Sequence, residues 1–444
     1  MVILQRLSLL FLLLFTPCYL FAAERAPGND TGPAVQAAQV PHYTSMEQNK
    51  AHGGQDALEA QNHQPQKTEI PPPLLEKENT ALIPYASNPV AARAVDRNIS
   101  LFADRIKERF SLYLLRSGKY LEMMKEILKG ENMPEDIAFL PLIESGFNPN
   151  AYSVARAVGP WQFIASTGKQ YGLKIDWWRD ERKDPVKSTY AAANYLKYLY
   201  EMFGSWNLAM AAYNAGEGKI LRALNRSKSD DYWDLLSTRH IKKETKEYVP
   251  RFIAAKLIAK DPDNYGFVDQ EYHPPLQYDE VVVEKPVDLE AAARCAETTP
   301  EVIRELNPEL RRWSTPPNVS DYKLRIPYGK KDIFMENLAG FSDEERFSLA
   351  TYTAKKGDTL KNVSSKTGIP VNVILDLNDG KGLKALKAGE IIYLPPKEKL
   401  ALDLDDRADL KKASAKNKKS IRKKPAEKKI IVTSLQKKQS YVND

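Results

Sequence analysis

Apolar residues recur at helical spacing through the middle of the chain, beginning near Val90. Alanine-rich stretches with this spacing predict long helices over residues 190–203 and 248–259. The periodic part is long enough to enclose a full hydrophobic core. We therefore predict a mainly α-helical domain over residues 81–265, with its core in residues 130–235.

A short helix is predicted to end at Glu144. Pro134 is followed by two acids, which is typical of a first helical turn. Gly146 suits the left-handed backbone of a helix end. Pro141 lies inside this helix and removes one backbone hydrogen bond, so we expect it to be short or kinked. Its apolar face comprises Ile137, Phe139, Leu140 and Ile143.

Glu144 is the candidate acid of the chain. A carboxylate at the end of an apolar helix is partly desolvated, which raises its pKa and lets it hold a proton near neutral pH. Glycosidases ordinarily use two carboxylates, an acid and either a base or a nucleophile. No second candidate stands out, because the next acids after Glu144 lie in what reads as a polar loop. These acids are Asp176, Asp180, Glu181 and Asp184, the last of which has the sequence of a helix N-cap before Pro185.

An ordered set of motifs surrounds Glu144, and it resembles the lytic transglycosylases of the goose-type lysozyme superfamily. This resemblance implies a lysozyme-like helical fold and an enzyme that cleaves the glycan strands of peptidoglycan. The matching segments are residues 116–120, 140–153, 159–173, 184–185 and 208–216.

The resemblance assigns roles to individual residues. Glu144 matches the single catalytic acid and base of the family, and Gln162 matches the glutamine of its Gly-Leu-Met-Gln motif. This chain has Pro160-Trp161 where many members have Leu-Met. The implied substrate-binding residues are Ser145, Trp161, Gln162, Ala212, Tyr213, Asn214, Gly216 and Tyr248.

Several of these residues also have a purely structural interpretation. Tyr213 and Asn214 stand where a helix end needs cap residues. Gln162 is compatible with a buried amide satisfied by backbone groups, and Trp161 with a core aromatic. Tyr248 competes with other helical tyrosines, which are Tyr198 and Tyr200.

With one acid, the substrate must stabilise its own oxocarbenium-like centre, and the 2-acetamido group of N-acetylmuramic acid can do so. The resemblance then implies that Glu144 protonates the glycosidic oxygen and afterwards activates the C6 hydroxyl of the same sugar. The product is a 1,6-anhydro ring made without water. A hydrolytic muramidase and a non-catalytic wall-binding scaffold stay as alternatives. Cutting from chain ends and cutting within strands both stay open.

The C-terminal part contains a segment that resembles a LysM module, over residues 351–395. We expect a strand, a helix from Leu360, a second helix over residues 370–377 and a closing strand over 391–394. LysM modules bind glycans that contain N-acetylglucosamine. The resemblance places the groove at Gly357, Asp358, Thr359, Leu360, Ile369 and Pro370.

A weaker copy precedes this module by 71 residues. Leu289, Ile303, Leu306 and Asn307 match Leu360, Ile374, Leu377 and Asn378 at that offset. We interpret residues 278–328 as a degenerate LysM-like domain. It lacks the Lys-Lys-Gly-Asp-Thr turn, so glycan binding by this domain stays open. A purely structural spacer is the alternative. The fold class is therefore a mainly α catalytic domain followed by small βααβ modules.

The N-terminus predicts export. Arg6 precedes an apolar run over residues 9–15, and small alanines follow it. This pattern is typical of a secretory signal peptide over residues 1–23. A lipid anchor at Cys18 is the alternative, although Pro17 stands where that signal uses a small residue. We expect a protein of the cell envelope or periplasm.

Residues 24–80 are rich in Pro, Gln and Asn and predict a flexible tether. After signal cleavage Cys295 is the remaining cysteine, so no intramolecular disulfide is expected. His42, His52 and His63 lie in the tether, and no metal-ligand spacing occurs. We predict neither a metal nor a cofactor.

The basic charge is concentrated in the tail, residues 396–444. Residues 411–438 hold twelve Lys or Arg and one acid, a net charge of +11. The whole chain carries +7, so the remainder carries −4. In an exported chain with glycan modules, a disordered tail of this charge favours anionic envelope polymers or lipid headgroups over nucleic acid, with a merely solubilising role as the alternative. We expect a monomer that binds peptidoglycan strands.

Overall fold

The computed structural model describes residues 85–378 and 386–400. The predicted signal peptide with Cys18, the tether and the basic run of residues 411–438 lie outside the described residues. None of the described helices is both long and apolar enough to cross a membrane.

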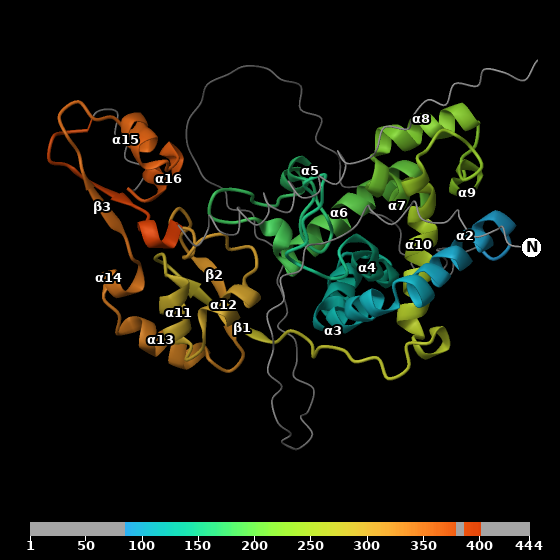
Figure 1. Cartoon of the computed structure of the whole chain (residues 1–444), viewed down its shortest axis with the longest axis horizontal. Helices are drawn as coiled ribbons and strands as arrows, with labels where there is room; N and C mark the ends of the chain where they lie inside the picture. Colours follow the sequence, from blue (N-terminus) through green and yellow to red (C-terminus); the bar gives the residue numbers. More distant parts are fainter. Residues whose placement is uncertain (1–84, 379–385, 401–444) are drawn as a thin grey trace, which may run out of the picture. The chain divides into compact units, whose positions relative to one another are not determined.

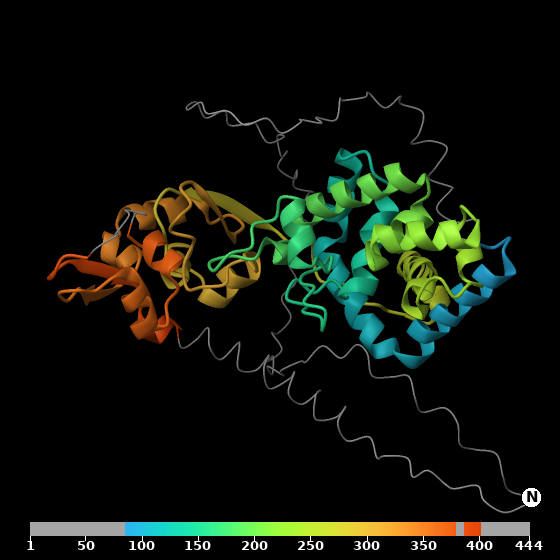
Figure 2. The same ribbon diagram turned by 90° about the horizontal axis from the view of Figure 1, so that it is seen from above.

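The described residues up to 265 form helices that gather into one bundle, coloured blue to yellow-green in Figures 1 and 2. This confirms the mainly α prediction. Helix α10 packs against α2, α4 and α7, and α3 packs against α6. The elements are α2 (Pro89–Ser100), the π-helix η1 (Leu101–Arg105), α3 (Lys107–Gly130), the 3₁₀ helix η2 (Glu135–Phe139), α4 (Leu140–Glu144), α5 (Ala165–Gln170), the 3₁₀ helix η3 (Glu181–Lys183), α6 (Pro185–Phe203), α7 (Trp206–Ala215), α8 (Glu217–Ser227), α9 (Tyr232–Leu235), α10 (Lys243–Lys260) and the 3₁₀ helix η4 (Asp263–Tyr265).

The predicted N-cap of α6 is confirmed. The Asp184 carboxylate accepts hydrogen bonds from the backbone N–H groups of Val186 and Lys187 at 2.8 and 3.0 Å. Helix α10 begins at Lys243, five residues before the predicted start at 248. Its first turn is charged, and apolar periodicity does not mark a charged turn.

The helix that carries Glu144 is short and divided, as Pro141 predicted. The 3₁₀ helix η2 comes first, and α4 then ends at Glu144. Gly146 adopts a φ of +61°, the left-handed conformation expected of it. A Cβ atom at Gly146 would lie 2.1 Å from the ring of Tyr113, so this turn also needs glycine for space.

Two small antiparallel sheets follow, each with two strands. In the first, Tyr278 of β1 lies opposite Pro327 of β2; in the second, Ala350 of β3 lies opposite Leu394 of β4. The predicted βααβ order is confirmed in both modules, whereas α13 and α14 were not predicted. The elements are β1 (Tyr278–Val283), α11 (Leu289–Cys295), α12 (Pro300–Leu306), β2 (Tyr322–Pro327), α13 (Lys331–Ala339), α14 (Asp343–Arg346), β3 (Ala350–Thr353), α15 (Leu360–Thr367), α16 (Val371–Asp376) and β4 (Ile391–Leu394).

In each module an asparagine at the equivalent position joins the second helix to the closing strand. Asn307 donates to the carbonyl of Arg325 at 2.7 Å and accepts from its N–H at 2.9 Å. Asn378 makes the same pair of bonds with Tyr393, both at 2.9 Å. The repeat seen as a constant offset in sequence is therefore a repeat of backbone contacts.

Replacing Asn307 by alanine should destabilise the first module. Asn307 is 1% exposed, so its loss leaves the buried backbone groups of Arg325 without partners. We expect a loss of about 2–4 kcal/mol in the free energy of unfolding, measured by urea denaturation. Asn378→Ala is the matched control. It should lower the free energy of unfolding by less, because the bond from Asn378 to the Tyr393 carbonyl is exposed to solvent. Equal losses would contradict this assignment.

Candidate active site

Glu144 and Tyr248 meet where α4 packs on α10. The Tyr248 hydroxyl donates a short hydrogen bond to Glu144 Oε1. Tyr248 is buried, whereas Glu144 keeps partial access to solvent. The competing tyrosines lie elsewhere, since Tyr200 stacks on Trp206 at 4.3 Å and Tyr198 is exposed.

The surroundings of Glu144 favour its protonated form. Desolvation by the packed protein raises the pKa of Glu144 from 4.5 to about 7. The hydrogen bond from Tyr248 and the charge of Arg251 oppose this rise, while the negative charge of Glu244 adds to it. Glu144 is thus close to half protonated at neutral pH, which suits a group that must both give and take a proton.

Backbone carbonyls between residues 159 and 163 orient two of the predicted site residues. Ser145 Oγ donates to the Pro160 carbonyl at 2.9 Å. The Tyr213 hydroxyl donates to the Trp161 carbonyl at 2.7 Å. Burial first, and the nearby Glu144 charge second, raise the pKa of Tyr213 well above 10, so it stays neutral. This loop therefore fixes the neighbours of the acid through its main chain.

Trp161 and Ala212 hold the site without presenting side chains to it. Both are 0% exposed. The Trp161 indole donates to Thr189 Oγ1 at 2.9 Å. This burial contradicts a substrate-binding role for the ring and fits the alternative of a core aromatic. Ala212 contributes its carbonyl, which accepts from the Gly216 N–H at 2.7 Å.

Gln162 and Asn214 are half-buried and already engaged with the protein. The Gln162 amide donates to the Gly159 carbonyl at 2.8 Å, and its backbone has a φ of +53°. Asn214 Oδ1, near the end of α7, accepts from Thr245 of α10 at 3.1 Å. Both keep partial exposure, and their contact with substrate stays a prediction.

Three of the four acids in the segment that we interpreted as a polar loop, residues 176–184, are buried. Asp180, Glu181 and Asp184 are at most 6% exposed. Each is paired: Asp180 with Arg182 at 2.7 Å, Glu181 with Lys187 at 2.8 Å, and Asp184 with Arg325 at 2.9 Å. Their partners come partly from distant sequence, which is why a local pattern could not show their burial.

Sequence reasoning missed three residues that hold the predicted site residues and the loop around them in place. They are Thr189, Thr245 and Arg182. Thr189 binds the Trp161 indole, and Thr245 binds Asn214. Arg182 binds the carbonyls of Arg156 and Phe163, both at 3.1 Å. A charged run such as residues 180–184 gives no signal that one of its arginines is buried. Within residues 85–378 and 386–400, no group of three or more His, Cys, Asp or Glu could hold a metal.

The predicted groove residues of the second module divide into two sets. Asp358, Leu360 and Ile369 are buried. Asp358 accepts hydrogen bonds from Tyr352 and Lys366, both at 2.7 Å. This contradicts a ligand-contacting role for these three side chains. The residues that remain exposed are Gly357, Thr359 and Pro370.

Three protein families match this chain in order. Residues 123–236 match the transglycosylase SLT domain. Residues 277–343 match a family described as the LysM-like domain of lytic transglycosylase MltD. Residues 352–395 match the LysM domain.

The chain is similar to known lytic transglycosylases. It is 32% identical over 316 residues to membrane-bound lytic murein transglycosylase D of Escherichia coli strain K12, covering 66% of this chain and 69% of that protein. It is 27% identical over 171 residues to membrane-bound lytic murein transglycosylase C of Salmonella typhimurium strain LT2, covering 32% of this chain and 46% of that protein. The crystal structure of the 70-kDa soluble lytic transglycosylase of Escherichia coli covers 41% of this chain and 30% of its own, with 24% identity and a TM-score of 0.29.

Replacing Glu144 by glutamine should change how stability depends on pH. The folded pKa of about 7 exceeds the unfolded value of 4.5, so the stability that the proton provides is lost as pH rises between them. Glutamine has no such loss and can still accept the Tyr248 bond. The variant should gain about 1–3 kcal/mol relative to the parent between pH 5 and pH 8, measured by urea unfolding. Glu244→Gln removes an exposed charge that adds to the pKa of Glu144, so it is the comparison variant and should show a smaller gain.

Proposed function

The chain belongs to the lytic murein transglycosylase family that includes the D enzyme of Escherichia coli, and we propose that Glu144 is its single catalytic acid and base. It is a peptidoglycan lytic transglycosylase that carries LysM modules. The observation that carries the assignment of Glu144 is its setting: a desolvated, partly accessible carboxyl with a pKa of about 7, held by Tyr248.

In the first step, protonated Glu144 gives its proton to the oxygen that links N-acetylmuramic acid to N-acetylglucosamine. The bond from C1 to that oxygen breaks, and the departing sugar keeps the proton as its 4-hydroxyl. The 2-acetamido oxygen of the muramic acid stabilises the positive charge at C1, so the protein supplies no second carboxylate. The Tyr248 hydroxyl then stabilises the carboxylate left on Glu144.

In the second step, the Glu144 carboxylate takes the proton of the C6 hydroxyl of the same muramic acid. The C6 oxygen bonds to C1 and closes a 1,6-anhydro ring. Glu144 ends protonated, ready for another turnover, and no water is consumed. A pKa near neutrality serves both directions of transfer.

A hydrolytic muramidase is the second candidate. It would need a water activated in place of the C6 hydroxyl. The acid whose charge acts on Glu144 is Glu244, an exposed residue in the first turn of α10. The acids at 180, 181 and 184 are bound in ion pairs, which argues against a role for them as a second base.

The second LysM module is proposed to bind the glycan strand through its exposed groove residues Gly357, Thr359 and Pro370. The protein is proposed to be exported to the cell envelope, in line with the N-terminal pattern and with a relative named as membrane-bound. The basic run of residues 411–438 would then face anionic envelope polymers or lipid headgroups.

Product mass distinguishes the two reactions. Purified protein should release muropeptides that end in 1,6-anhydro-muramic acid from peptidoglycan, measured by mass spectrometry. Glu144→Gln should release none, because an amide cannot give or take the proton. Glu244→Gln should retain the activity of the parent. Products heavier by one water would identify a muramidase instead.

The pH profile tests the acid directly. The first step requires protonated Glu144, so kcat/KM should fall about tenfold per pH unit above pH 7. Tyr248→Phe removes a bond that lowers the pKa of Glu144, so the alkaline limb should move upward by about one unit while kcat decreases. An unchanged limb in Tyr248→Phe would show that another group titrates there.

A further inference from the structure

Residues 180–184 form a turn that contacts both the active-site loop of residues 157–163 and the first LysM-like module. The turn is built around η3, with Asp180 as its N-cap and Asp184 as its C-cap. Its middle faces the loop, and its two ends face the module.

Arg182 connects the middle of the turn to the loop. Its side chain is 8% exposed and binds Asp180 through two hydrogen bonds, at 2.8 and 2.7 Å. Its Nη1 donates to the carbonyl of Arg156, the residue just before the loop, and to that of Phe163, the last residue of the loop. The backbones also touch: a Cβ atom at Gly159 would lie 1.8 Å from the Arg182 carbonyl oxygen. Any movement of this turn therefore reaches the loop.

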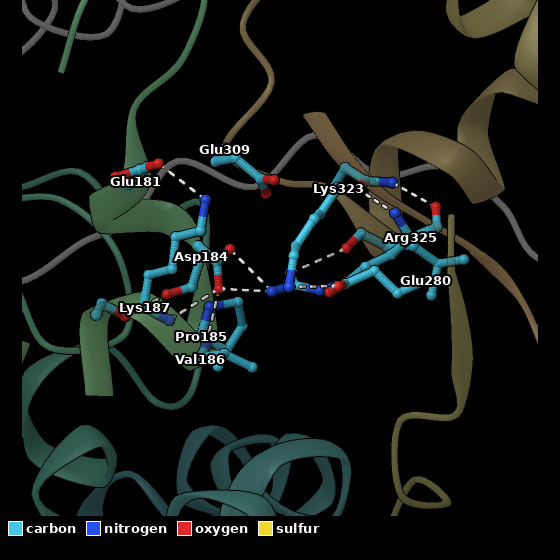
Figure 3. A network of polar contacts seen from close by, with 12 residues as sticks. Glu181, Asp184, Pro185, Val186, Lys187, Glu280, Glu309, Lys323 and Arg325 are labelled. Atoms are coloured by element: carbon cyan, nitrogen blue, oxygen red, sulfur yellow. Dashed lines mark hydrogen bonds and ion pairs between the residues drawn. The ribbon is translucent and has the colours of Figure 1, made fainter. Parts of the chain in front are cut away.

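The first module holds both ends of the turn. The Asp180 N–H donates to the Glu309 carbonyl at 2.8 Å. Arg325 of β2 donates through Nη2 to both carboxylate oxygens of Asp184, at 3.1 and 2.9 Å (Figure 3). The two side chains of this ion pair are 6% and 0% exposed. A buried pair of this kind fixes position, because separating its members leaves a charge without a partner inside the protein.

The Glu309 side chain lies near the ion pair of Asp184 and Arg325 (Figure 3). Its carboxyl accepts from the Tyr322 hydroxyl at 2.8 Å. Burial, and then the charge of Asp184, raise the pKa of Glu309.

We propose that the first LysM-like module is a positioning element for the active site: it holds the turn at residues 180–184, and Arg182 transmits that position to the loop of residues 157–163. This loop supplies the two carbonyls that orient Ser145 and Tyr213. The inference rests on the proposed role of Glu144, and it gives the module a role other than that of a spacer or a glycan site.

A second set of contacts also joins the module to the loop of residues 157–163. Asp184, the partner of Arg325, also caps α6. One turn into that helix, Thr189 accepts the indole N–H of Trp161. The loop is thus held from two points, Arg182 and Thr189, and both lie on the segment that the module fixes.

The test compares three variants of the full-length chain. Arg325→Ala removes the cation from the module side. Asp184→Asn removes the anion from the other side but keeps an oxygen that can cap α6. Lys323→Ala is the matched control, since Lys323 lies two residues before Arg325 in β2 and is 61% exposed, paired with Glu280 at 3.2 Å.

Two quantities are measured for each variant: kcat and KM on soluble, uncross-linked peptidoglycan strands, and hydrogen exchange of the peptide that covers residues 157–163. Arg325→Ala and Asp184→Asn should lower kcat about tenfold with KM within about twofold, because the loop is displaced while glycan binding is kept. Exchange of the Val158 amide, which bonds the Phe163 carbonyl at 3.0 Å, should accelerate in both. Lys323→Ala should match the parent.

Parent-like kcat and parent-like exchange in Asp184→Asn would overturn the proposal and leave the module a spacer. If Arg325→Ala fails to fold, Asp184→Asn decides alone. Failure of the proposed catalytic role is seen separately, as Glu144→Gln retaining the parent activity. The exchange measurement does not depend on that outcome.

Discussion

A carboxylic acid keeps its proton at neutral pH only where the protein withdraws water from it, and much of this structure serves that requirement at Glu144. The acid must also remain reachable by a polymer. The divided helix η2–α4 satisfies both conditions, because it ends at Glu144 and turns away at Gly146. Helix α10 closes the other side and supplies Tyr248.

Support for the acid comes mainly from backbone groups. Carbonyls of the 157–163 loop hold Ser145 and Tyr213, while the Trp161 ring is turned into the core. Backbone carbonyls keep their position only if the loop does. Arg182 fixes the loop with a guanidinium that is itself neutralised by Asp180. Such buried pairs contribute little net stability but specify geometry strongly, since breaking one is costly.

The sequence predicted those features that depend on local chemistry. Glycine after Glu144 and proline after Asp184 report backbone needs within a few residues, and each was found as expected. The constant offset predicted the repeated module, but not the bonds that Asn307 and Asn378 make with residues 18 and 15 positions away. The burial of Trp161 was not predictable in this way. Its partner, Thr189, lies on helix α6, and no local pattern shows which helix face a distant ring will meet.

The charged run at residues 180–184 was misread for the same reason. Charges are usually solvated, so a run of them was interpreted as a polar loop. Here Asp184 finds its counter-charge in Arg325, across 141 residues of sequence. The LysM groove was divided likewise: Asp358 is turned inward by Lys366 and Tyr352, which a motif match does not reveal.

Direct titration of Glu144 tests the central claim. Infrared difference spectra between the parent and Glu144→Gln isolate the carboxyl band of this one residue as pH is varied. A protonated band that disappears around pH 7 is the predicted result. A midpoint near 4.5, the ordinary value for a glutamate, would mean that Glu144 is ionised at neutral pH and cannot be the resting acid.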